Sequence, residues 1–197
     1  MKKIYDGVQR FCAAHPRFGI SNLMRVIVAG NVAVYVLMLL TQSNDVNALN
    51  FLTFNLHALL RGEVWRLVTF VFVPAYSSPF SLLISLYFYY WIGSTLERQW
   101  GTAKFNLYYI SGMLLTVLGT VLASLITGNY YLTVAGTNYV NLSMFFAFAV
   151  LFPNAQVLLF FIIPVKMKWL AYLDGALFAF DIISAIGRHS WGGVVLP

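Results

Sequence analysis

The chain has 197 residues, of which 60% are apolar, 17% are aromatic and only 9% are charged. Soluble domains carry about 25% charged residues, so this chain has too few charges to cover a surface that faces water. A disordered chain and an ordinary soluble enzyme are both excluded. Long apolar runs in a bilayer are satisfied best as helices, and the sequence predicts an all-α integral membrane protein.

The net charge of +6 does not indicate a nucleic-acid-binding protein. The Lys and Arg residues lie in short clusters between apolar runs, whereas nucleic acid requires a single basic face. The lone Cys12 cannot form an internal disulfide. The histidines at positions 15, 57 and 189 are far apart and have no cysteine nearby, so we expect neither a metal site nor a cofactor.

Residues 1–22 form a basic cytoplasmic segment, and residues 23–197 form the membrane domain. Within the first segment, Ile4, Val8 and Phe11 fall on one helical face, with charged side chains elsewhere. This pattern predicts a short amphipathic helix that lies on the inner membrane surface. A disordered basic tail is the alternative.

The apolar runs predict the membrane spans, because about 20 apolar residues cross a bilayer as a helix. The long run that begins at Leu67 is interrupted by Pro74 and Pro79, and proline breaks the helical hydrogen-bond ladder. Residues 67–78 are therefore expected to be a re-entrant or loop segment. Five spans are then predicted, at residues 23–40, 79–93, 105–126, 135–152 and 169–186.

The cationic residues orient this bundle, because cytoplasmic segments are enriched in Lys and Arg. With the N-terminus in the cytoplasm, nine of the 12 cationic residues lie on the inner side and three on the outer side. The inner residues are Lys2, Lys3, Arg10, Arg17, Arg25, Arg98, Lys104, Lys166 and Lys168, and the outer ones are Arg61, Arg66 and Arg188. We therefore expect a cytoplasmic N-terminus.

Four short segments resemble landmarks of the rhomboid superfamily, which includes intramembrane serine peptidases of the S54 type and the inactive derlins. Residues 62–69 (GEVWRLVT) resemble the Trp-Arg signature of the first outer loop, and residues 93–97 (GSTLE) resemble the end of the second helix. Residues 147–154 (AFAVLFPN) resemble the inner end of the fourth helix, and residues 163–169 (IPVKMKW) resemble the linker to the fifth. The order and spacing of these segments favour a rhomboid-like bundle.

The resemblance also indicates which residue of this chain stands where the family's peptidases have their catalytic serine. Peptidases of this family carry Gly-x-Ser-Gly at the start of the fourth helix, and counting back from Pro153 puts that motif on Gly136, Thr137, Asn138 and Tyr139. Asn138 would occupy the position of the nucleophile. An amide can form hydrogen bonds, but it cannot act as an acyl-accepting alkoxide.

Two further parts of the peptidase machinery are replaced as well, and one of them is the last glycine of the motif, where Tyr139 adds a ring. The family's His-x-x-x-Asn pair on the second helix, which helps to hold the oxyanion, falls on Ser81 and Ser85. Ser143 lies about 140° around the fourth helix from Asn138, so we interpret it as a helix-packing serine. His189 follows the fifth span directly, so we interpret it as a loop histidine and not as the base of the sixth helix.

Other polar residues in or near the membrane have two interpretations each. Asp174 and Asp181 share one face of the fifth span, where they are polar handles for a client helix or a proton path, or form hydrogen bonds within the bundle. The outer loop around Trp65 and Arg66 is either a scaffold for the mouth of the bundle or a simple interfacial anchor.

The resemblance implies a six-helix protein, and a new apolar run starts at residues 194–197 (VVLP). We expect the chain to be a fragment that lacks the sixth helix, with a complete five-span protein as the alternative. The topology and the fourth-helix segment suggest a bacterial plasma membrane, and a membrane of the endoplasmic reticulum is the other possibility. The sequence does not specify an oligomeric state.

The function implied by the resemblance is that of a rhomboid-like pseudoprotease. Such a protein binds transmembrane segments of client proteins without cleaving them, and its partners are the lipid bilayer and client helices, not nucleic acid. The alternative is an active rhomboid serine endopeptidase, which requires a nucleophile that the sequence does not show. A small transporter would need inverted repeats, and none is evident.

Overall fold

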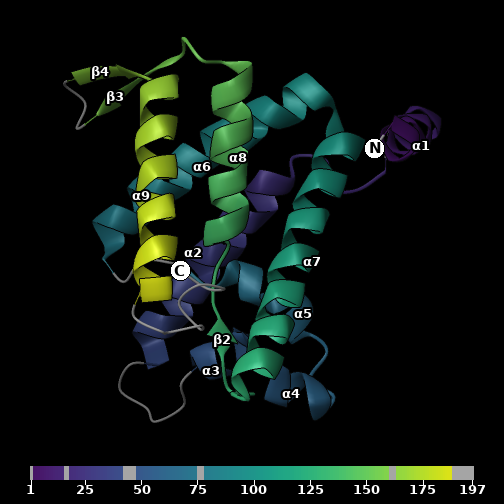
Figure 1. Ribbon diagram of the computed structural model, residues 1–197, viewed down its shortest axis with the longest axis vertical. Coiled ribbons are helices and arrows are strands. Elements are labelled where there is room, and N and C mark those ends of the chain that lie inside the picture. Colours follow the sequence, from purple (N-terminus) through teal and green to yellow (C-terminus); the bar gives the residue numbers. More distant parts are fainter. Residues whose placement is uncertain (1, 16–17, 42–47, 75–77, 160–162, 188–197) are drawn as a thin grey trace.

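A computed structural model describes residues 2–15, 18–41, 48–74, 78–159 and 163–187 of the chain. It is a helical bundle in which α8 lies between α7 and α9 (Figure 1). Among the described residues, only α2 and α7 are both long and apolar enough to cross a membrane by length and composition. The long helices are α2 (Leu23–Thr41), α6 (Pro79–Trp100), α7 (Thr102–Thr127), α8 (Asn138–Leu151) and α9 (Met167–Gly187).

Short elements complete the described fold, and several of them gather at the end of the bundle opposite α1 (Figure 1). The helices among them are α1 (Lys2–Ala14), α3 (Ala48–Leu52), α4 (Leu56–Leu60), α5 (Arg66–Thr69) and η1 (Phe70–Phe72). The strands are β1 (Phe54–Asn55), β2 (Thr133–Val134), β3 (Gln156–Leu159) and β4 (Ile163–Lys166).

The strands are a departure from the all-α prediction. β1 pairs with β2 in antiparallel register, with Phe54 opposite Val134, and β3 pairs with β4 as a hairpin after α8. The hairpin contains the β-branched residues Val157, Ile163 and Val165, which favour extended backbone. The sequence analysis missed it because so short an apolar run does not distinguish a strand from a helical segment.

Helix α6 is longer than the predicted span, which ended at Gly93. It continues to Trp100, and its last turns remain inside the bundle because Leu96 is fully buried and Glu97 is 8% exposed. The chain then turns at Gly101, which has a φ of +84° and donates its N–H to the carbonyl of Glu97 at 2.8 Å. A positive φ of this kind suits glycine.

The core is built where α6 packs against α2, α7 and α8. Gly93 allows the closest approach, because a Cβ at this position would overlap the side chain of Met24 on α2. Ile92 and Leu96 are fully buried on α6, and they contact a cluster of apolar side chains that includes Phe105. The last helix, α9, packs mainly on α8 and β4, at the edge of this core.

The segment expected to be re-entrant or a loop forms short helical turns against α2. Phe70 and Val71 are buried in the bundle, and Gly30 on α2 lies so close to Phe72 that a Cβ at position 30 would overlap its ring. Non-helical backbone at membrane depth is tolerated only when protein surrounds it. These contacts meet that requirement for the described part of the segment.

Helix α1 lies at the side of the bundle, where it contacts α7, and it is seen end-on, whereas α7 stands upright in the same view (Figure 1). Its axis is therefore roughly perpendicular to the bundle. Cys12 is buried on this helix, and Phe11 is 40% exposed. This arrangement fits a helix lying along a membrane surface.

Candidate functional site

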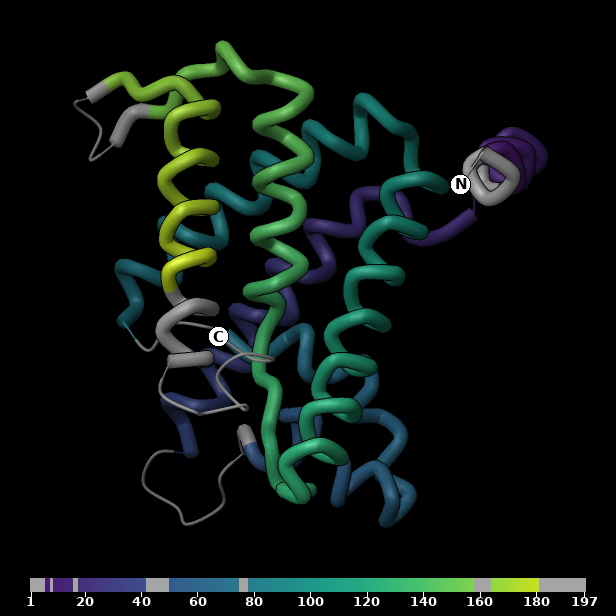
Figure 2. Tube along the Cα trace, viewed as in Figure 1, coloured from purple at the N-terminus to yellow at the C-terminus, as the bar shows by residue number. Residues whose placement is uncertain are grey.

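Helix α8 begins part of the way along the bundle. It has 14 residues, which span about 21 Å at 1.5 Å per residue, less than the roughly 30 Å of a hydrocarbon core. The predicted fourth span began at Ala135, but the backbone from Ala135 to Thr137 is not helical. Instead, the chain rises from the C-terminal end of α7 as an extended strand and enters α8 at mid-height (Figure 2).

Contacts with the outer loop hold this extended segment in place. Val134 pairs with Phe54, and Gly136 donates its N–H to the carbonyl of Phe70 at 2.9 Å. Gly136 has a φ of +77°, a conformation that L side chains rarely adopt. The start of α8 is therefore fixed by tertiary hydrogen bonds. They explain why the helix begins three residues later than the span predicted from the apolar run.

A small cavity of about 30 Å³ lies beside the start of α8. This volume is enough for about one water molecule. Ser85 from α6 and Asn138 from α8 both line it, so the structure brings together two of the positions where the family resemblance places replaced catalytic groups. The polar residues of the lining are Asn31, Ser85, Tyr89, Thr137, Asn138 and Asn141.

Ser81, the other member of the replaced pair, does not line this cavity. It is exposed on the first turn of α6, whereas Ser85 is half-buried and donates its hydroxyl to the carbonyl of Leu82 at 2.9 Å. The two serines share a helix face, but only the inner one reaches the start of α8.

The residue that the sequence analysis missed is Asn31. It is 6% exposed, and its side-chain amide donates to the carbonyls of Ile27 at 2.9 Å and Val71 at 3.3 Å. It therefore joins α2 to the buried turns that follow the outer loop. An asparagine inside an otherwise apolar span was the available signal, since such residues are costly in lipid and usually have partners.

The chemistry of the cavity is that of hydrogen bonding. Its lining in the described structure includes no His, Lys, Asp or Glu, so a hydroxyl there has no neighbouring base to activate it. Ser143, the other candidate considered, donates to the carbonyl of Val140 at 2.8 Å within its own helix. The described residues also hold no cluster of side chains suited to a metal ion.

The outer loop is organised around Arg66, whose side chain is buried although it carries a full charge. Its Nε donates to Glu63 at 2.6 Å, and its Nη1 donates to the carbonyls of Asn50 and, at 2.7 Å, of Thr53. Next to it, Trp65 donates its indole N–H to Phe51 at 3.3 Å and keeps its ring half exposed. The loop is thus tied to the segment that follows α2.

The remaining candidate residues are not gathered at the cavity. Asp174 is half-buried on α9, next to Gly175, which faces the ring of Phe146 on α8. The side chain of Asp181 and the whole of His189 lie outside the described residues.

The fold and the composition define a helical integral membrane protein. The chain belongs to the family described as "Eukaryotic integral membrane protein (DUF1751)", whose model matches residues 25–193. No curated protein and no solved structure matches the chain. The membrane location is thereby established, but a eukaryotic family does not agree with the bacterial plasma membrane expected from the sequence.

Proposed function

We propose that this protein is a rhomboid-like pseudoprotease of a eukaryotic membrane, which binds transmembrane helices of client proteins without cleaving them. The observation that carries the proposal is the start of α8 at partial depth, beside a polar cavity that Asn138 and Ser85 both line. In the family that the sequence resembles, the nucleophile and one oxyanion-holding residue stand at these two positions.

The side chains present support binding and not hydrolysis. Acyl transfer requires a nucleophile with an adjacent base and hydrogen-bond donors for the oxyanion. Asn138 and Asn141 provide amide donors and acceptors at this depth, but neither can form a covalent acyl intermediate. A site of this kind can still hold polar groups of another helix.

The exposure of Asn138 supports a helical ligand. Its side chain is exposed on the first turn of α8, and at this depth the surroundings are lipid or protein, not bulk water. A polar group in hydrocarbon without a partner costs several kcal/mol. A client helix carrying Ser, Thr or Asn at the same depth would provide that partner, with Asp174 on α9 as a second polar contact.

The five-span topology and the cytoplasmic N-terminus are parts of the same proposal. Nine of the 12 cationic residues then lie on the cytoplasmic side, in agreement with the general enrichment of Lys and Arg there. The ends of α6 and α9 that carry Arg98 and Lys168 are the inner ends in this orientation.

Site-specific crosslinking tests the proposal. A photoreactive amino acid at position 138 should capture other membrane proteins in cells, whereas the same group at Leu118, which is 55% exposed on the flank of α7, should capture mainly lipid. The captured proteins should be recovered at full length. Equal capture from the two positions, or recovery of cleaved products, would contradict client binding without proteolysis.

A further inference from the structure

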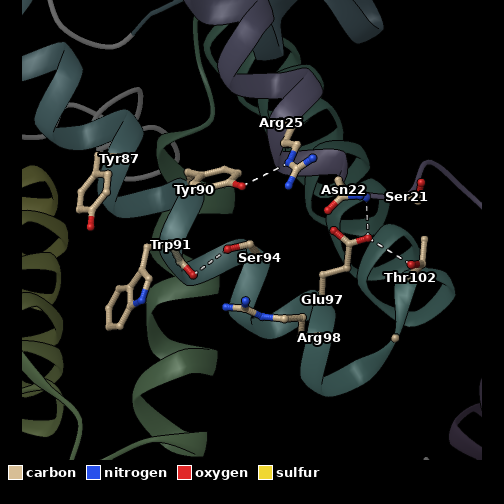
Figure 3. A pocket seen from close by; sticks show the side chains of 11 residues that line it. Ser21, Asn22, Arg25, Tyr87, Tyr90, Trp91, Ser94, Glu97, Arg98 and Thr102 are labelled. Carbon is tan, nitrogen blue, oxygen red and sulfur yellow. Dashed lines mark hydrogen bonds between the residues drawn. The ribbon is translucent and has the colours of Figure 1, made fainter.

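A second pocket, separate from the cavity at α8, lies where the start of α2 meets the end of α6 (Figure 3). Its volume is about 500 Å³, within the roughly 300–1,000 Å³ of small-molecule sites. Arg25 from α2 and Arg98 from α6 both line it, together with the hydroxyl groups of Ser21, Ser94 and Tyr90.

The pocket carries an excess of positive charge. Arg25 donates from Nε to the hydroxyl of Tyr90 at 3.3 Å, and Arg98 donates from Nη2 to Thr95 at 3.2 Å. Both partners are neutral, and the one ion pair within the described part of the chain joins Arg66 to Glu63 instead. Two exposed guanidinium groups therefore keep N–H groups available for an anion.

One carboxylate, that of Glu97, also lines the pocket, but it is engaged in holding helix starts. Its Oε1 accepts the backbone N–H of Asn22 at 2.8 Å and the hydroxyl of Thr102 at 3.1 Å (Figure 3). Glu97 is 8% exposed, and its single negative charge leaves the two arginines of the lining in excess.

The other walls indicate where the pocket lies in a membrane. Trp91 lines it together with the arginines, two residues before the end of the predicted span at Gly93, and aromatic rings of this kind collect at the level of the headgroups. Tyr87 is 71% exposed on the outer face of α6. The pocket thus places cationic groups beside a side chain directed at lipid, an arrangement suited to a ligand with an anionic head and apolar tails.

We propose that this pocket binds the headgroup of an anionic glycerophospholipid from the cytoplasmic leaflet. Arg25 and Arg98 hold the phosphate, since guanidinium groups match phosphate oxygens in bidentate geometry. Ser21 and Ser94 also line the pocket, and its volume leaves room for a polyol or an amino acid attached to the phosphate.

The test is lipid binding to the full chain, measured by native mass spectrometry in detergent with phosphatidylinositol, and with phosphatidylcholine as the neutral reference. The double variant R25Q/R98Q should lower binding of phosphatidylinositol by at least about tenfold, since the phosphate loses its charge-assisted hydrogen bonds to both guanidinium groups. The matched control is K166Q/K168Q, which removes the same charge from the inner side of β4 and α9, outside the pocket. It should change binding by less than about threefold.

Ser94→Leu gives a second test that leaves the charge unaltered. The larger side chain narrows the pocket, so it should weaken the binding of phosphatidylinositol. The small amount of bound phosphatidylcholine should not change. Equal losses in the two charge variants would mean that lipid adheres to a basic surface and not to this pocket, which would overturn the proposal. The proposal would also be overturned if R25Q/R98Q bound phosphatidylinositol as well as the unaltered protein does. It would be overturned equally if the same concentration of soluble glycerophosphoinositol displaced the lipid.

Discussion

The carboxylate of Glu97 accepts the backbone N–H of Asn22 at 2.8 Å, and so connects the end of α6 to the residue before α2. Asn22 has a φ of +56°, which is uncommon for a residue other than glycine. The same oxygen accepts the hydroxyl of Thr102 at the start of α7. A single buried carboxylate therefore fixes the relative positions of α2, α6 and α7 at one end of the bundle.

Replacing Glu97 by alanine should destabilise the protein by about 1–3 kcal/mol, because the part-buried backbone N–H of Asn22 and the hydroxyl of Thr102 lose a charged acceptor. Thermal unfolding in detergent measures the effect. The matched control is Gln99→Ala, two residues away and exposed, which should change stability by less than about 0.5 kcal/mol. Similar changes in the two variants would show that Glu97 does not hold the helix starts.

The approach of α6 to α2 gives a second prediction. Gly93→Ala should lower stability by about 1–3 kcal/mol, because the added methyl group overlaps Met24 in a packed core. Gly119→Ala on α7 is the control, since nothing lies within 4 Å of the place that its added methyl group would take. Removing a helical glycine should there be neutral or stabilising by about 0.5–1 kcal/mol. The contact would be refuted if the effects of Gly93→Ala and Met24→Ala on stability were simply additive in the double variant.

The outer loop gives a third prediction. Arg66→Ala should destabilise the protein by about 1–3 kcal/mol, because Glu63 and the carbonyls of Asn50 and Thr53 lose their donor. Arg61 is exposed, and Arg61→Ala should cost less than about 0.5 kcal/mol. Thermal unfolding in detergent compares the two. Equal costs would mean that the loop is not organised around Arg66.

Topology is the subject of the fourth prediction. Reporter fusions after Gly101 and Lys168 should report the cytoplasm, and a fusion after Gly128 should report the opposite side, because most cationic residues would then be cytoplasmic. A glycosylation acceptor inserted after Gly128 measures the same property in a eukaryotic cell. The reverse pattern would overturn the orientation and would move the pocket at Arg25 to the other leaflet.

The fifth prediction concerns chemistry. The purified protein should not be labelled by serine-directed fluorophosphonates and should not cleave a generic rhomboid substrate, because Asn138 stands at the position of the nucleophile. An active rhomboid peptidase assayed in parallel shows that the reagents work. Labelling that disappears in Ser143→Ala would reveal a displaced nucleophile and would end the pseudoprotease proposal.

Apolar runs located the long helices but not their ends. The spans read from the sequence overlap α2, α6, α7, α8 and α9, because burial and lipid exposure both select apolar residues over whole helices. The end of α6 and the start of α8 were misplaced, since a carboxylate bound to another helix and the bond between Gly136 and Phe70 determine them. Contacts between distant parts of a chain leave no periodic signal.

The polar cavity also shows how far prediction from the sequence could reach. The family resemblance, counted from Pro153 and Glu97, was enough to choose Ser85 and Asn138 as residues to compare, and the structure puts both of them on one cavity. It could not separate Ser85 from Ser81, because residues four apart share a helix face. Asn31 was overlooked because its partner, the carbonyl of Val71, lies 40 positions along the chain.

The seating of α8 on the outer loop has a consequence for biogenesis. Phe54 and Phe70, which receive the segment before α8, are made well before Val134 and Gly136 leave the ribosome. Synthesis proceeds from the N-terminus, and early segments fold before later ones. We therefore expect the loop between α2 and α6 to be the surface on which the later helix docks, and damage to that loop should appear first as failed docking of α8 during synthesis.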